Sequence, residues 1–125
     1  MSLCLIVDDS AVIRKVARRI VEGAGYSVVE AADASEALIA CRRAMPNLIL
    51  LDGMMPGMGG ADFLLKLRKM PGGDAPKVVY CSTEVDVAQM ARANRAGANF
   101  HLQKPFDREI LLAKLAETGT VPAAV

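Results

Sequence analysis

Short apolar runs alternate with stretches of helical periodicity along the whole of this 125-residue chain. The first run, LCLIV at residues 3–7, lacks the polar alternation of a half-exposed strand and is typical of a parallel strand buried on both faces. Four more runs predict strands at residues 26–31, 47–51, 77–81 and 98–103. Strands that alternate with helices favour a parallel sheet covered by helices on both faces.

The first expected helix follows Ser10 and is amphipathic. Its apolar residues recur at helical spacing and predict a buried face made by Val12, Ile13, Val16, Ala17, Ile20 and Val21. Basic residues repeat the same spacing on the opposite side, at Arg14, Lys15, Arg18 and Arg19. We interpret this basic side as a solvated face, with a docking patch for a partner protein as the alternative.

Capping residues indicate where the later helices begin. Asp33 and Glu36 have the spacing of a variant capping box, which predicts the start of the second helix. Helical patterns follow at residues 60–70 and 85–96. Asp107 is placed to cap the last helix.

The handedness of the connections determines how the sheet is wound. Crossovers between parallel strands are right-handed, which predicts a doubly wound sheet. The chain is too short for an eight-stranded barrel. In the expected fifth strand, Asn99, His101 and Gln103 share one face, while Phe100 and Leu102 share the other. A half-polar strand of this kind belongs at an edge of the sheet.

Size and charge limit the class of protein. A chain of this length is expected to form one domain with one core. The net charge of +1 provides no bulk field for nucleic acid or an anionic membrane. No apolar run is long enough to span a bilayer, so membrane insertion is not expected.

The start of the chain and the cysteines indicate a cytoplasmic protein. MSLCLIVDDS carries two acids where a signal peptide would continue its apolar region, so no export signal is expected. Cys4, Cys41 and Cys81 lie inside apolar segments and lack CxxC spacing. This pattern predicts buried free thiols in a reducing compartment.

Polar residues follow several of the expected strands. In an open α/β sheet, ligands bind beyond the carboxyl ends of the strands. The residues at those ends are Asp8, Asp9, Asp52, Ser82, Thr83 and Lys104, the last of them followed by Pro105. We therefore expect carboxylates, hydroxyls and an amine to converge on one rim of the sheet.

Crowded carboxylates need a counter-charge. Two carboxylates ~4 Å apart repel by about 4 kcal/mol at an effective dielectric constant of roughly 20. Three of them must take up a proton or bind a cation. Mg²⁺ fits a site built from oxygen ligands, with Mn²⁺ or Ca²⁺ as possible substitutes. The turn at residues 53–55 can aim a backbone carbonyl at the same ion.

Asp52 is the candidate nucleophile. A carboxylate beside Mg²⁺ can attack a phosphoryl group in line and become an aspartyl phosphate. Lys104 would offset the charge that develops on the phosphoryl oxygens, and Ser82 can donate a hydrogen bond to them.

Four motifs carry a family resemblance: VDDS at 7–10, LLDGMMPGMGG at 50–60, CSTE at 81–84 and QKPF at 103–106. The chain resembles a receiver domain of the two-component response regulators, and its stand-alone build is similar to the chemotaxis response regulator. The resemblance implies a flavodoxin-like, doubly wound, five-stranded parallel sheet of order 2-1-3-4-5, flanked by five helices. It implies a receiver domain over residues 1–118 and a short C-terminal tail over 119–125.

The resemblance also implies the metal and phosphoryl chemistry. Asp52 would accept phosphate from a histidine kinase or a phosphotransfer protein. Mg²⁺ would be bound by Asp9, Asp52 and the Met54 backbone carbonyl, with Asp8 nearby, directly or through water. Slow self-dephosphorylation is the most turnover expected, so the chain is not expected to be an enzyme.

The residues implied in switching depart in part from the family pattern. Lys104 would contact the phosphoryl group, and its bond to Pro105 would be cis. Ser82 would be the switch hydroxyl, although Thr is commoner at that position. Thr83 stands where a small Ala is usual, so its bulk can narrow access to the phosphate. His101 stands where the family usually has a rotating Tyr or Phe.

Output is expected to pass through protein contact. Phosphorylation would change the face made by the fourth helix, the fifth strand and the fifth helix, biasing a two-state equilibrium toward binding of a target protein. From the length of the chain, no DNA-binding output domain is expected, and a monomer is expected. Chemotaxis or motility is one pathway consistent with the resemblance.

Other functions fit these residues less well. A Mg²⁺-dependent aspartyl-phosphate phosphatase would carry a second acid two residues after Asp52, where this chain has Met54. A nucleotide-binding protein would need a GxxxxGK[ST] loop, which the sequence lacks. An FMN carrier would need a hydroxyl-rich loop after the first strand, where VDDS stands. A phosphate-independent adaptor would not need the acids or Lys104.

Overall fold

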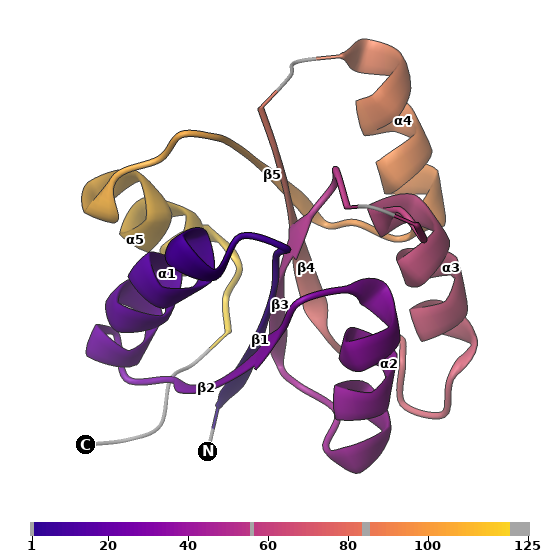
Figure 1. Ribbon diagram of the computed structural model, residues 1–125, viewed down its shortest axis with the longest axis horizontal. Helices are drawn as coiled ribbons and strands as arrows, with labels where there is room; N and C mark the ends of the chain where they lie inside the picture. Colours follow the sequence, from indigo (N-terminus) through magenta and orange to yellow (C-terminus); the bar gives the residue numbers. More distant parts are fainter. Residues whose placement is uncertain (1, 56, 84–85, 121–125) are drawn as a thin grey trace.

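One parallel sheet lies between two layers of helices in the computed structural model, which describes residues 2–55, 57–83 and 86–120 (Figure 1). The strands are β1 (Leu3–Val7), β2 (Ser27–Ala31), β3 (Leu48–Asp52), β4 (Lys77–Ser82) and β5 (Phe100–Gln103). Their order is β2-β1-β3-β4-β5, and every neighbouring pair is parallel. The expected fold class is therefore confirmed, and β5 lies at an edge as its half-polar pattern predicts.

The helices of the described residues are α1 (Ala11–Gly23), α2 (Ala34–Arg43), α3 (Gly60–Lys69), α4 (Val87–Ala96) and α5 (Arg108–Glu117). In Figure 1, α1 and α5 cover one face of the sheet, and α2, α3 and α4 cover the other. Each helix layer encloses its own core against the sheet. The three inner strands β1, β3 and β4 are therefore largely shielded from water on both sides, whereas Val29 of the edge strand β2 is 40% exposed.

The central strand shows how the two cores are divided. Leu48 and Leu50 of β3 belong to the core under α1 and α5, and Ile49 and Leu51 belong to the core under α2, α3 and α4. All four side chains are buried because successive residues of a strand point to opposite faces. The unbroken apolar run that precedes Asp52 is the consequence of this double burial.

Side-chain caps define the starts of the helices. The expected caps at Asp33 and Asp107 are present: Asp33 accepts from the Glu36 N–H at 2.8 Å, and Asp107 from the Ile110 N–H at 2.8 Å. Ser10 caps α1, accepting from the Ile13 N–H at 3.3 Å. The fourth helix begins later than residue 85 because Asp86 is its cap and accepts from the Ala88 N–H. Residues 84 and 85 lie outside the described residues.

The apolar face of α1 is buried over only part of its length. Ala17, Ile20 and Val21 are buried, but Val12 is 73% exposed and Val16 is 52% exposed. The expectation that Val12, Ile13 and Val16 enter the core was therefore wrong. The first turns of α1 lie beside Pro105 and Phe106, in the connection between β5 and α5, and the last turns lie over the sheet.

The cysteines and the C-terminal segment complete the fold. Cys4, Cys41 and Cys81 are buried free thiols, as expected. After α5, the Thr120 hydroxyl lies 2.6 Å from the Tyr26 hydroxyl, so residue 120 contacts the body of the fold. Residues 121–125 of the expected tail lie outside the described residues, and the boundary at residue 118 stays a prediction.

Candidate functional site

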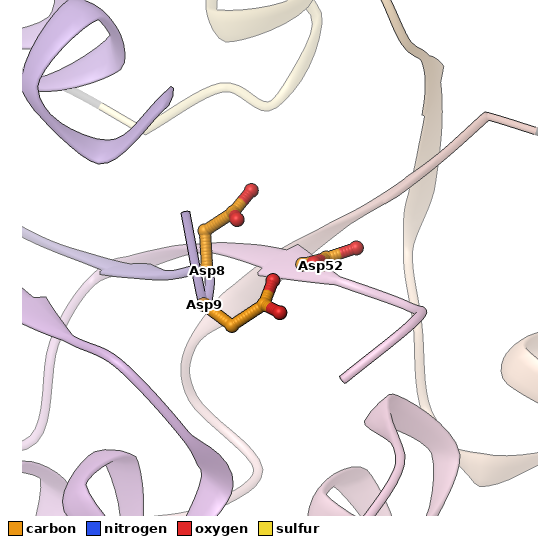
Figure 2. Close-up of side chains that lie close together, drawn as sticks. All are labelled: Asp8, Asp9 and Asp52. Atoms are coloured by element: carbon orange, nitrogen blue, oxygen red, sulfur yellow. The ribbon is translucent and has the colours of Figure 1, made fainter. Parts of the chain in front are cut away.

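Three carboxylates lie together at the carboxyl end of the sheet (Figure 2). Asp8 and Asp9 follow β1, and Asp52 ends β3; the parallel pairing of Val7 with Leu51 places these strand ends side by side. Each acid offers an oxygen within 4.8 Å of an oxygen of the other two. Asp8 and Asp52 are buried, whereas Asp9 is exposed and faces the solvent side of the cluster.

Lys104 is the cation of this cluster. Its backbone N–H donates to the Ser82 carbonyl at the end of β4, 2.8 Å away, and its peptide bond to Pro105 is cis. Its Nζ lies 2.6 Å from Asp8 Oδ2 and 3.4 Å from Asp52 Oδ1. The Lys104 ammonium is therefore shared between the two buried carboxylates.

The surroundings shift the titration of Asp52 and Lys104. Burial raises the pKa of Asp52, against the opposing effects of the Met54 N–H, which donates to Oδ1 at 3.1 Å, and of the Lys104 charge. Burial alone would lower the pKa of Lys104, but the hydrogen bond with Asp8 and the charge of Asp52 outweigh it, and the pKa is raised. A charged lysine thus stands beside a carboxyl whose ionised form is disfavoured by burial, and an added cation would favour that form.

Backbone contacts hold the Asp8 carboxylate in place. The Ser10 N–H donates to Asp8 Oδ1 at 2.8 Å. Arg14, from the basic side of α1, donates from Nη1 to the Asp8 backbone carbonyl at 2.5 Å and pairs through Nε with Glu30 at 3.1 Å. Sequence reasoning missed the link from Glu30 through Arg14 to the acid cluster.

The basic side of α1 is not simply a solvated face. Glu30 of β2 also binds Lys15 and Arg18, each at 2.9 Å. The hydrogen bond from Lys15 and those from Arg18 and Arg14 lower the pKa of Glu30 to about 2 against the effect of burial. A lone acid in the second strand, opposite four cations on the first helix, was the available signal.

The other expected site residues lie around the cluster. Ser82 ends β4 and is half-buried. Thr83 is exposed and lines a shallow apolar pocket with Ile13 and Phe106. The Met54 side chain is 57% exposed, and its sulfur accepts from the Gln89 amide at 3.6 Å.

His101 is linked to the loop after Asp52 through Tyr80. It pairs in register with Tyr80 of β4, and the two rings meet edge to face with centroids 6.0 Å apart. Its Nε2 lies 2.7 Å from Asn94 Oδ1 on α4. Sequence reasoning treated Tyr80 only as a strand residue, although its hydroxyl donates to the Gly53 carbonyl next to Asp52, at 3.4 Å.

Comparison with known proteins identifies the family. Residues 4–116 match the family described as response regulator receiver domain. The chain belongs to this family. As a receiver domain of a two-component response regulator, it is a member of a class of phosphoacceptors that act with histidine kinases or phosphotransfer proteins and with downstream targets.

Solved structures with the same fold include a chemotaxis protein and a CheY-like receiver domain protein. The receiver is 33% identical to the chemotaxis protein CheY4 of Vibrio cholerae, with a TM-score of 0.91 over 94% of this chain and 98% of that one. It is 32% identical to a CheY-like receiver domain protein of Methanospirillum hungatei, with a TM-score of 0.85 over 94% of this chain and 92% of that one.

The curated relatives are longer proteins. The receiver is 32% identical to the DNA-binding response regulator MtrA of Mycolicibacterium paratuberculosis over 89% of this chain and 48% of MtrA. It is 37% identical to the response regulator MprA of a Mycobacterium species over 89% of this chain and 47% of MprA. The chain thus spans about half the length of these relatives. Among its described helices, none has the length and apolar character needed to cross a membrane.

Proposed function

We propose that Asp52 accepts a phosphoryl group from a phosphohistidine of a kinase or phosphotransfer protein, in a reaction that depends on Mg²⁺. An Asp52 oxygen attacks the phosphorus; the O–P bond forms as the N–P bond breaks, and the imidazole leaves with the electron pair and takes a proton. The observation that carries the proposal is Lys104, whose Nζ reaches both Asp8 and Asp52 at the mouth of the acid cluster.

The acid cluster fits a divalent cation. Carboxylate oxygens from three residues within 4.8 Å are the donors that a hard cation prefers. Asp8, Asp9 and Asp52 would hold Mg²⁺ together with the Met54 backbone carbonyl, and Mn²⁺ or Ca²⁺ would compete for the same oxygens. When bound, the ion supplies positive charge that offsets the charge developing on the phosphoryl oxygens.

Lys104, Ser82 and Thr83 would receive the phosphoryl group. Lys104 exchanges its contact with Asp8 for a phosphoryl oxygen, which stabilises the product. The Ser82 hydroxyl donates a hydrogen bond to another phosphoryl oxygen. Thr83 stands exposed at the mouth, where its bulk limits the approach of water and of external phosphatases.

The exposed apolar part of α1 supports a protein as phosphodonor. Val12, Ile13, Val16, Pro105 and Phe106, here called the docking patch, flank Lys104 at the same rim. Hydration of exposed apolar side chains such as Val12, which is 73% exposed, is unfavourable, and a partner surface that buries them would remove this free-energy cost. We place the histidine-bearing helices of the kinase or phosphotransfer protein on this patch.

The output is binding of a protein target by the face of α4, β5 and α5. His101 lies on this face and contacts both Tyr80 and Asn94. The net charge of +1 provides no bulk field for nucleic acid, and we expect a monomer that contacts protein in the cytoplasm. The likeness to CheY4 supports a place in chemotaxis or motility.

Turnover would be limited to slow self-dephosphorylation. Aspartyl-phosphate phosphatases use a general acid two residues after the nucleophile, and this position holds Met54. A thioether cannot deliver a proton to a leaving group. The phosphoryl group would therefore persist on Asp52 as a signal.

Incubation with acetyl phosphate tests the proposal. Intact mass is recorded with Mg²⁺, with EDTA, and for Asp52→Asn. One phosphoryl group should be gained by the wild type with Mg²⁺ only. A mass gain that survives in Asp52→Asn or in EDTA contradicts the proposal, and rapid release of phosphate over many turnovers would indicate the phosphatase instead.

A further inference from the structure

The Tyr80 ring fills the space beneath the loop that follows Asp52. Tyr80 is 4% exposed and lies in the core under α2, α3 and α4. A Cβ added to Gly53 would lie 2.5 Å from Tyr80 Cε1, and a Cβ added to Gly60 would lie 2.9 Å from Cε2. Two glycines that flank the candidate phosphoacceptor loop thus leave room for this one ring.

One end of Tyr80 is bonded to the phosphoacceptor loop. The hydroxyl donates to the Gly53 carbonyl at 3.4 Å. Gly53 lies between Asp52 and Met54, and the Met54 N–H donates to Asp52 Oδ1 at 3.1 Å. A change in the position of the Asp52 carboxylate therefore moves the peptide unit to which Tyr80 is attached.

The edge of Tyr80 contacts the output face. The Tyr80 and His101 rings are inclined by 62°, with centroids 6.0 Å apart, and the two residues are paired across β4 and β5. His101 in turn lies 2.7 Å from Asn94 on α4 through Nε2. Contacts thus run without a gap from Asp52 through Gly53, Tyr80 and His101 to α4.

We infer that Tyr80 is the positioning residue that transmits phosphorylation of Asp52 to His101 and α4. This inference rests on the proposed function and deepens it. The interior next to the phosphoacceptor loop is occupied by Tyr80, so His101 cannot turn inward unless the Tyr80 ring moves first. Displacement of the Gly53 carbonyl shifts the ring, and the ring edge shifts His101 against Asn94.

The chain provides its own reporter for this motion. His101 is its only histidine, so the ring Cε1–H signal in an NMR spectrum belongs to that residue without assignment. Spectra are recorded near pH 8, above the His101 pKa, which burial lowers from its ordinary value of 6.5. A shift on phosphorylation then reports a changed environment and not protonation of the ring.

Variants at Tyr80 separate transmission from core packing. Acetyl phosphate with Mg²⁺ should shift the His101 signal in the wild type and not in Asp52→Asn. In Tyr80→Leu, the phosphorylated fraction measured by mass should match the wild type while the His101 shift falls below about half, because the ring edge is gone. Tyr80→Phe keeps the ring and should retain most of the shift, whereas a purely structural role would leave the shift intact in every folded variant.

A second variant tests the contact path without phosphate. Gly53→Ala forces the Tyr80 ring away from its present position and should shift the His101 signal in the unphosphorylated protein. An unchanged signal in Gly53→Ala, or a full phosphorylation-dependent shift in Tyr80→Leu, overturns the inference while leaving Asp52 as phosphoacceptor. If the wild type gains phosphoryl mass without any shift of the His101 signal, the inference about Tyr80 is overturned but the proposed function stands. If the wild type gains no mass, the proposed function and the inference are overturned together.

Discussion

Lys104 is bonded to Asp8 more closely than to Asp52, at 2.6 Å against 3.4 Å. The amine therefore rests on the carboxylate that is not the proposed nucleophile, while still touching the one that is. Both acids and the lysine are largely buried, so each charge depends on the other two.

Removal of the amine should destabilise the fold. Lys104→Met leaves Asp8 and Asp52 buried without a counter-ion, which we expect to lower the free energy of unfolding by about 3 kcal/mol in EDTA. Urea denaturation measures the change. The matched control is Lys114→Met, which breaks the more exposed pair with Glu117 at 3.0 Å and should cost less than about 1 kcal/mol. Equal losses in the two variants would contradict a buried charge cluster.

Neutralising Asp52 should stabilise the metal-free protein. Asp52→Asn removes a buried charge next to Asp8 and should raise the melting temperature in EDTA by roughly 3–5 °C, equivalent to about 1 kcal/mol. The pKa of Asp52 is raised above 3.8 in the fold, so the wild type loses stability as pH rises through that range. The higher melting temperature of Asp52→Asn relative to the wild type should therefore vanish near pH 3 and be fully present at pH 7.

Metal should reverse the ranking of the same two proteins. Mg²⁺ binds the folded wild type through its acids and should raise its melting temperature with concentration. Asp52→Asn lacks one ligand and should respond much less. Calorimetric scans with and without Mg²⁺ measure both effects, and a wild type that is insensitive to Mg²⁺ would argue against the metal site.

Glu30 should stabilise the fold more at neutral pH than in acid. Glu30→Gln removes the partner of Arg14, Lys15 and Arg18 and should cost about 1–3 kcal/mol at pH 7. The pKa of Glu30 falls from 4.5 to about 2 on folding, so its contribution is present above 4.5 and is lost as pH falls toward 2. Urea titrations at pH 7, 5 and 3 follow this loss.

A second glutamate serves as the control for Glu30. Glu22→Gln removes a pair with Arg18 in which the glutamate side chain is 46% exposed, and it should cost less than about 0.5 kcal/mol at each pH. A loss in Glu30→Gln that does not depend on pH would show that the carboxylate charge is not the stabilising feature.

The docking patch should affect the rate of phosphotransfer from a protein donor and not the rate of phosphorylation by a small-molecule donor. Val16→Asp places a charge in the patch and should slow phosphotransfer from a cognate kinase, found by profiling the kinases of the host cell, by at least about tenfold. Phosphorylation by acetyl phosphate should be unchanged. Ile39→Asp, at a comparably exposed residue of α2 on the opposite layer, should change neither rate. A comparable loss in Ile39→Asp would move the docking site away from α1.

The site acids could be predicted from sequence because topology alone brings them together. Asp8 and Asp52 each follow an apolar run, and neighbouring parallel strands must end on the same rim. Lys104 follows from the same rule for the edge strand. These positions depend on strand order and direction, which periodicity reveals, and not on the details of packing.

Contacts between side chains of different elements could not be predicted in this way. Periodicity identified the apolar face of α1 but not that Val12 and Val16 lie beyond the sheet, because the length of the overhang depends on the loop after β1. The space that Gly53 and Gly60 leave for Tyr80 exists only once β3, β4 and α3 are assembled. Sequence alone therefore indicates which polar side chains converge at the end of the sheet better than it indicates which side chains pack together between elements.

The most direct test of the account locates the phosphoryl group on the chain. The protein is phosphorylated by a phosphohistidine donor in the presence of Mg²⁺ and reduced at once with borohydride, which converts an aspartyl phosphate to homoserine. Tandem mass spectrometry of the peptides then identifies the modified residue. We predict homoserine at position 52 and unmodified Asp8 and Asp9. Homoserine at position 8 or 9, or an unmodified Asp52 in a chain that has gained phosphate, would contradict the account.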